Sequence, residues 1–163
     1  MEIEMIIGNP LEIAIQLEYV IDYCSPSGFF NFVINDKLIP GKGVDTDLFV
    51  VIASLKESVN WYLQNEPKDI GDIKLESMDF SEGAPDNIIF LDCCELSDHG
   101  CVFWLGFDGD EERLFYSTDY EKTIQEQRYP KGTIANLINS LPNSFDLKIN
   151  RINDDITNTE IIS

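Results

Sequence analysis

The residues best suited to metal chemistry lie between positions 93 and 101. Cys93, Cys94, His99 and Cys101 include side-chain types that zinc accepts as ligands. Cys93 and Cys94, however, are neighbours on a predicted strand, so their side chains point to opposite faces. A structural zinc site needs ligand pairs that converge tetrahedrally, usually from turns. We therefore interpret the cysteines as packed thiols and His99 as a surface residue, and expect no metal.

The acidic run Asp108-Gly109-Asp110-Glu111-Glu112 is the next candidate, in this case for calcium. A calcium loop of the EF-hand type needs oxygen ligands at alternate positions, glycine at the sixth position and glutamate at the twelfth. Here glycine is the second residue and the pattern stops. The Asp-Gly pair instead predicts the turn of a charged β-hairpin.

Nucleophilic catalysis would depend on His99, the only histidine of the chain. It lies in a predicted turn, Asp98-His99-Gly100, where nothing orients its ring. Neither a Gly-x-Ser-x-Gly elbow nor a phosphate-binding glycine-rich loop with lysine occurs in the sequence. A small hydrolase that uses carboxylates or the neighbouring Cys and His residues stays open as an alternative.

The elements that would position these residues follow from the apolar periodicity. Alternating residues predict strands at 12–23, 29–35, 37–39, 88–95, 101–107, 113–117, 123–129 and 145–149. The first of these strands is expected to have one buried and one solvated face.

Helical spacing from Leu48 to Leu63 predicts a helix that is capped by Asp45 or Asp47 and ends before Pro67. A second helix is expected from Thr133, as its cap, to Leu141. Residues 65–87 are expected to form a loop with one short element.

These elements predict an α+β fold: an antiparallel sheet of about six or seven strands with two helices packed on one face. We expect a single domain over residues 1–152 and a polar C-terminal tail over 153–163. The aromatic residues of the chain are assigned to packing because they lie on or near predicted core faces; they include Trp61, Tyr62, Phe103 and Trp104.

The charge of the chain is its most informative property. Thirty acidic residues against eleven basic ones give a formal charge of −19, although 44% of the residues are hydrophobic and the chain should fold. Fourteen of the acids, against two lysines, lie between residues 66 and 112, a net charge of −12. Such a surface attracts basic partners, whereas it disfavours nucleic acid and anionic membranes.

Several stretches resemble a bacterial immunity protein of a polymorphic toxin system, and more narrowly the immunity protein 42 family. They are spread from Met5 to about Leu147 and comprise Met5-Ile6-Ile7-Gly8-Asn9-Pro10, Ile13-Ala14-Ile15-Gln16, Gly28-Phe29-Phe30, Trp104-Leu105-Gly106-Phe107-Asp108 and Tyr129-Pro130-Lys131-Gly132-Thr133. The resemblance implies an α+β protein that neutralises a toxin domain encoded nearby, often a nuclease. It implies no enzymatic activity and no cofactor.

We therefore expect a cytoplasmic immunity protein that binds a basic toxin domain through an acidic surface. The start of the chain lacks the pattern of a secretory signal. The acids expected to contact the toxin lie on predicted turns, where side chains can reach a partner: Asp98, Asp108, Asp110, Glu111 and Glu112. The alternatives are the small hydrolase and an acidic adaptor domain that binds no toxin.

Overall fold

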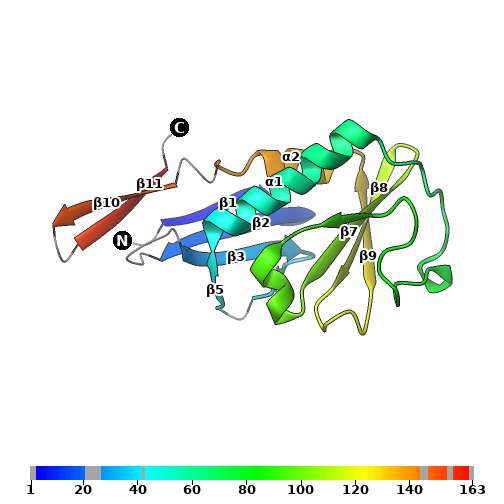
Figure 1. The fold of residues 1–163 in the computed structure, drawn as a ribbon, viewed down its shortest axis with the longest axis horizontal. Coiled ribbons are helices and arrows are strands. Elements are labelled where there is room, and N and C mark those ends of the chain that lie inside the picture. Colours follow the sequence, from blue (N-terminus) through cyan, green and yellow to red (C-terminus); the bar gives the residue numbers. More distant parts are fainter. Residues whose placement is uncertain (1–2, 21–26, 42, 144–146, 154–155, 162–163) are drawn as a thin grey trace.

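The described residues form two larger antiparallel sheets, a two-stranded C-terminal hairpin and two α-helices (Figure 1). The structure is a computed structural model that describes residues 3–20, 27–41, 43–143, 147–153 and 156–161. The predicted α+β class and the antiparallel pairing are confirmed, with the strands divided between two sheets. The parts of the first predicted strand and of its turn that fall on residues 21–26 lie outside the described residues, as does Cys24.

The first sheet contains the N-terminal strands in the order β1-β2-β3-β4, with β5 also paired to β3. These strands are β1 (Ile3–Asn9), β2 (Ile13–Val20), β3 (Ser27–Ile34), β4 (Lys37–Ile39) and β5 (Asp45–Asp47). The expectation of one solvated face on β2 is wrong, because every side chain from 13 to 17 is buried. Gln16 is satisfied there by the amide of Asn31 at 2.7 Å, as a buried polar side chain must be.

The second sheet follows later in the chain, in the order β6-β7-β8-β9. Its strands are β6 (Ile89–Leu91), β7 (Val102–Asp108), β8 (Glu111–Ser117) and β9 (Gln125–Pro130). The predicted Asp-Gly turn joins β7 to β8, and Gly109 has a φ of +59° there, which glycine adopts without strain. Two short 3-10 helices, η1 (Leu75–Ser77) and η2 (Cys94–His99), lie in the connections before and after β6.

Helix α1 (Leu48–Asn65) joins the two sheets, because it contacts β3 of the first and β6 of the second. Its buried stripe includes Val51, Leu55 and Val59. As predicted, Asp47 caps the helix, with its side chain accepting from the Val50 N–H at 3.2 Å. Phe32 and Phe103 connect the sheets directly, with ring centroids 4.5 Å apart.

Helix α2 (Thr133–Asn139) packs against α1 and begins differently from the prediction. Thr133 is the first helical residue and not the cap, because its hydroxyl donates to the Pro130 carbonyl. The cap comes from a distant strand. The carboxylate of Glu112 on β8 accepts from the N–H groups of Gly132 at 2.9 Å and Ile134 at 2.6 Å. Glu112 is 0% exposed and so takes the place of a local cap residue.

The C-terminal residues form a hairpin of β10 (Leu147–Asn153) and β11 (Ile156–Ile161). The predicted strand at 145–149 corresponds to β10, whereas its first residues, 145 and 146, lie outside the described residues. Strand β11 falls in the stretch for which the sequence predicts a polar tail. The boundary at residue 152 stays a prediction.

Replacing Glu112 with alanine should lower the free energy of unfolding by about 1–3 kcal/mol at neutral pH, because the N–H groups of Gly132 and Ile134 at the start of α2 lose their acceptor. Urea unfolding measures this change. The matched control is Glu57→Ala, which removes an exposed carboxylate from α1 and should leave the free energy of unfolding within about 0.5 kcal/mol of wild type.

The difference in unfolding free energy between wild type and the Glu112 variant should also depend on pH. Burial raises the pKa of the Glu112 carboxyl, and the N–H groups of Ile134 and Gly132 oppose this rise. The stability that this group contributes is therefore present below the unfolded carboxyl pKa and is lost as pH rises through the folded pKa. Alanine does not titrate, so the gap in unfolding free energy between wild type and Glu112→Ala should narrow with rising pH. A gap that widens would contradict this role of burial.

Candidate partner-binding surface

The structure divides the five predicted contact acids between the two ends of β7. Asp108, Asp110 and Glu111 lie at the β7–β8 turn, where Asp108 and Glu111 pair in register. Asp98 lies in η2, before β7 begins. A strand of this length separates its ends by about 20 Å. The chain therefore does not bring Asp98 together with the acids of the turn.

The prediction that Glu112 faces a partner is wrong. Glu112 belongs to β8 and is fully buried against the start of α2. The sequence placed it on an exposed turn because four acidic or glycine residues precede it. Its side chain instead points to the interior face of the strand, where two backbone N–H groups satisfy it.

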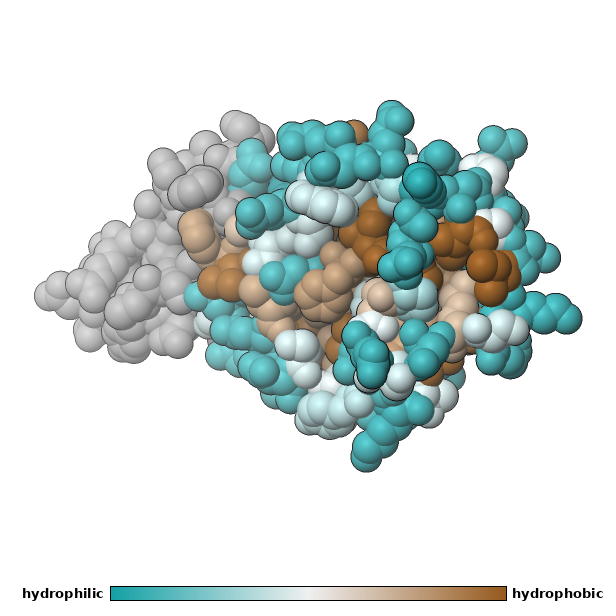
Figure 2. All heavy atoms as spheres, turned by 45° about the vertical axis from the view of Figure 1, so that its right-hand side comes forward, coloured by the Kyte–Doolittle hydropathy of each residue, from teal (hydrophilic) through white to brown (hydrophobic). Residues whose placement is uncertain are grey.

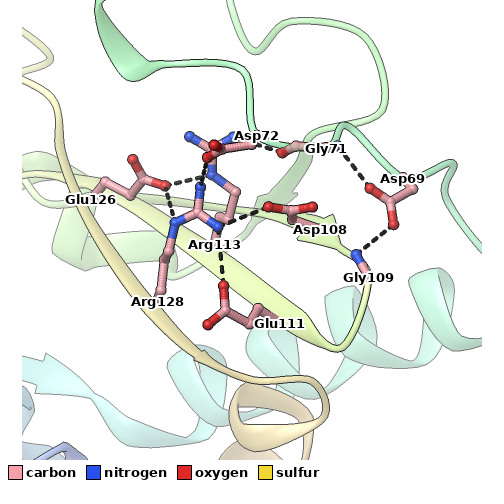
Figure 3. A network of polar contacts seen from close by, with 9 residues as sticks. All are labelled: Asp69, Gly71, Asp72, Asp108, Gly109, Glu111, Arg113, Glu126 and Arg128. Carbon is pink, nitrogen blue, oxygen red and sulfur yellow. Dashed lines mark hydrogen bonds and ion pairs between the residues drawn. The ribbon is translucent and has the colours of Figure 1, made fainter.

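Arg128 on β9 holds the acids of the turn (Figure 3). Its guanidinium lies 2.9 Å from Asp108 and 3.1 Å from Glu111. It also lies 2.7 Å from Asp72, which belongs to the loop after α1. The hydrogen bonds that Arg128 donates to Asp108 and Glu111, that to Asp108 first, raise its pKa above the ordinary value. Of the predicted contact acids, Asp98 and Asp110 are thus exposed outside this cluster.

A buried arginine extends the cluster inward. Arg113 on β8 is 1% exposed, forms an ion pair with Glu126, and donates to the Gly71 carbonyl at 3.0 Å. Arg113 and Arg128 are directly opposite on β8 and β9. Like charges in such a pair repel each other, so Glu126 between them, 3.5 Å from Arg128, is needed to offset the repulsion.

Hydrogen bonds of Asp69 and Ile70 fix the beginning of residues 66–86, which we call the acidic segment, onto this end of the second sheet. The Asp69 carboxylate accepts from the N–H groups of Gly109 at 2.6 Å and Gly71 at 2.7 Å. These hydrogen bonds, that of Gly109 first, lower the pKa of Asp69. The Ile70 N–H donates to the Phe107 carbonyl at 2.8 Å. The acidic segment is therefore joined to the β7–β8 hairpin at residues 69 and 70.

Apolar side chains hold the rest of the acidic segment over the outer face of the second sheet. The segment contributes Ile70, Leu75, Met78 and Phe80 to a cluster that also contains Ile88, Trp104 and Phe115. The Phe80 ring lies 5.0 Å from Trp104 and 5.7 Å from Phe115, centroid to centroid. At Gly106 a Cβ would come within 2.6 Å of the Ile70 side chain, so glycine makes room for this anchor.

The outward side of the acidic segment is strongly anionic. All its acids are exposed: Glu66, Asp69, Asp72, Glu76, Asp79, Glu82 and Asp86. Only Lys68 and Lys74 oppose these seven acids, which gives the segment a net charge of −5. Because the backbone is held in place, this charge forms a fixed surface, which favours recognition of a basic partner.

The described cysteines are buried or half-buried, and His99 is half-buried. Cys93 and Cys101 are buried, and burial raises the pKa of the Cys93 thiol to about 12. Burial likewise raises the pKa of Cys94, whose sulfur lies 2.9 Å from the Ser54 hydroxyl. Such thiols are protonated at neutral pH and are poor nucleophiles. Among the described residues, no group of three or more His, Cys, Asp or Glu side chains could hold a metal ion.

One aromatic residue departs from its predicted place. Tyr62, Phe103 and Trp104 are buried, as expected, but Trp61 is 57% exposed. It lies between the buried residues Val59 and Tyr62 of α1 but faces solvent, beside the beginning of the acidic segment. Within the described part of the chain, no helix is both long and apolar enough to cross a membrane.

The sequence patterns did not single out Arg128, Arg113 or Asp69. A signal for the two arginines existed, because the predicted β8–β9 meander can place Arg113 and Arg128 in one cross-strand pair. A strand that buries Arg113 between apolar neighbours requires a carboxylate partner. Asp69 gave no such signal for its bond to the hairpin, since Gly109 lies forty residues later in the chain.

Comparison with known proteins gives one family and one similar structure. A sequence profile of the family described as immunity protein 42 matches residues 5–144. The crystal structure of CdiI from Burkholderia dolosa AUO158 is similar in fold, with a TM-score of 0.55 and 16% sequence identity. The similarity covers 83% of this chain and 96% of the CdiI chain. Comparison with curated proteins gave no match.

Replacing Arg128 with alanine should loosen the acidic segment, because the carboxylates of Asp72, Asp108 and Glu111 would then repel one another. We expect roughly fivefold faster hydrogen exchange at the amides of Ile70 and Gly109, with a loss of about 1 kcal/mol in unfolding free energy. Hydrogen exchange read by mass spectrometry measures it. Lys122→Ala, which removes an exposed cation outside the cluster, should leave both amides unchanged. Equal exchange in the two variants would show that Arg128 does not hold the segment.

Proposed function

The chain belongs to the immunity protein 42 family, and from this premise we propose that it protects its host by binding a toxin domain encoded by a neighbouring gene. The resemblance that the sequence suggested is thereby confirmed at the level of the family. The toxin, its reaction and the surface that binds it are our proposals. We further propose that the protein acts in the cytoplasm and binds without catalysing a reaction.

The observation that carries the proposed binding mode is the anchored acidic segment. It presents seven exposed acids against two lysines on a backbone that is fixed to the second sheet. A rigid surface loses less conformational entropy on binding than a mobile one, so more of its interaction energy remains as affinity. Its field can raise the rate of association with a basic partner by about 10- to 1000-fold at low salt.

A nuclease is the toxin class that such a surface fits best. A nuclease must present basic residues to the phosphates of its substrate. An acidic surface of fixed geometry can occupy those residues in place of the nucleic acid. The acidic segment then inhibits by competition for the basic surface and needs no contact with the catalytic groups of the toxin.

The predicted contact acids differ in how they contribute to the proposed binding surface. Asp110 lies at the β7–β8 turn beside the acidic segment, which makes it part of the same surface. Asp108 and Glu111 stabilise that surface through their ion pairs with Arg128. The part of their negative charge that Arg128 does not neutralise adds to the field of the surface. Asp98 is separated from it by the length of β7 and would contact only a partner that spans the sheet.

Coexpression with the toxin domain of the neighbouring gene is the direct test of the function. Cells that express the toxin domain should survive only when this protein is present, and the two proteins should copurify as a complex. A folded protein of equal size and net charge should not rescue the cells. Killing in spite of soluble, folded protein would refute the immunity function and leave the adaptor or the hydrolase as explanations.

Charge reversal tests whether the acidic segment provides the electrostatic attraction. Replacing Glu76, Glu82 and Asp86 with lysine should slow association with the toxin by about tenfold at low salt and flatten its salt dependence. These acids are exposed and lie away from the Arg128 cluster. Stopped-flow mixing over a range of salt concentrations measures the effect.

The matched control changes the net charge equally at other places. Glu12, Glu57 and Glu121 are exposed acids outside the acidic segment, and their replacement with lysine should slow association far less. Equal slowing in both triple variants would mean that only the total charge matters, and the acidic segment would lose its assigned role.

A further inference from the structure

A pocket of about 590 Å³ opens at the edge of the second sheet, beside the start of the acidic segment. Trp61 and Asn65 line it from the last turns of α1, and Glu66 to Lys68 line it from the chain that follows the helix. Residues 87–90, which lead into β6, form the opposite wall. The pocket thus lies where a helix end, an edge strand and the acidic segment meet.

Two large aromatic side chains at this pocket are exposed to solvent. Trp61 is 57% exposed and Phe90 is 47% exposed. Phe90 lies between Ile89 and Leu91, whose side chains are buried in the main core, so its own side chain projects to the other face. Tryptophan and other aromatic residues are enriched at the centres of protein interfaces, where they dominate the binding energy. Figure 2 shows apolar residues gathered in a band on this side of the molecule, bounded by hydrophilic ones.

Strand β6 adds a second reason to expect a partner here. It is an edge strand: within the described part of the chain it pairs with β7 on one side and with no strand on the other. Its three residues are all apolar: Ile89, Phe90 and Leu91. Soluble proteins protect edge strands by keeping them very short or by placing lysine, proline or a bulge there, because an unprotected edge pairs with other chains. Strand β6 is short but carries neither lysine nor proline. Ile89 and Leu91 are already buried, so Phe90 is the apolar side chain that this edge presents to a partner.

The charge around the pocket indicates the kind of segment that covers it. Glu66 and Lys68 both line the pocket, and the acidic segment that begins there has a net charge of −5. A positively charged side chain at this place would lie beside Glu66, within the field of the acidic segment, and could also rest on the face of an aromatic ring, which attracts cations. An acidic segment of a partner could meet Lys68 but would be repelled by the rest of the acidic segment.

We propose that this pocket binds an extended segment of the toxin that carries a lysine or arginine flanked by an apolar residue. The basic side chain lies against Trp61 and Glu66, and the apolar residue packs against Phe90 at the β6 edge. The proposal rests on the proposed immunity function and names a site within it. In this arrangement the acidic segment raises the rate at which the toxin associates, and the aromatic pocket lowers the rate at which it dissociates.

This division of roles makes the site testable by separating association from dissociation. Trp61→Ala and Phe90→Ala should each weaken binding of the purified toxin domain of the neighbouring gene by on the order of 30-fold. The loss should appear as faster dissociation, with an association rate close to that of wild type. Surface plasmon resonance gives both rates. Because both side chains are exposed, the thermal unfolding of the variants should match that of wild type.

A matched control removes an equally exposed apolar side chain elsewhere. Leu11, in the turn between β1 and β2, is 77% exposed, and Leu11→Ala should bind the toxin as wild type does. A third variant, Trp61→Lys, should bind more weakly than Trp61→Ala, because it places a cation where the toxin is expected to supply one.

The outcomes separate the two proposals. If wild-type protein neither binds the toxin domain nor rescues cells, the immunity function itself is wrong. If wild type binds but the Trp61 and Phe90 variants bind equally well, only the pocket is overturned. If Trp61→Ala instead abolishes self-association of wild type, measured by analytical ultracentrifugation, a second copy of this chain occupies the pocket and the proposal is also overturned.

Discussion

The structure depends on apolar anchors that hold a self-repelling segment in place. Seven acids within residues 66–86 repel one another, but each is exposed, and screening in water limits such repulsion to tenths of a kcal/mol per pair. A large apolar side chain contributes on the order of 1.5–3 kcal/mol when fully buried, and a part of this when half-buried, as the anchors of the segment are. Ile70, Leu75, Met78 and Phe80 pack against the second sheet and together outweigh the repulsion. The charge can therefore be displayed on a fixed backbone.

Local patterns were sufficient to predict the elements whose stabilising contacts are local. Helix α1 begins after its cap Asp47 and ends before Pro67, as periodicity and proline geometry indicate. The β7–β8 hairpin forms at the Asp-Gly pair for the same reason. The division into two sheets was not predictable in this way. It depends on α1 and on contacts such as Phe32 with Phe103, which join residues seventy positions apart.

At the candidate surface, too, local patterns do not predict contacts between distant segments. The sequence correctly marks residues 66–112 as the most acidic part of the chain, but it treats every acid there as a free surface charge. Asp69, Asp108 and Glu112 each have a structural partner on another element, namely Gly109, Arg128 and the start of α2. For Trp61 the sequence errs in the opposite direction: helical periodicity places it next to the core stripe, whereas its side chain is 57% exposed. Only the packing of distant segments distinguishes a carboxylate that holds the fold from one that meets a partner.

The cap of α2 has a consequence for the order in which the chain folds. With seven residues, α2 is too short to persist by itself in water, and the acceptor for its first amides belongs to β8. As the polypeptide leaves the ribosome, residues 111–117 emerge before residues 133–139. The second sheet can thus form first and supply the acceptor on which α2 nucleates. Helix α2 then forms late, and only on a β7–β8 hairpin that has its native register.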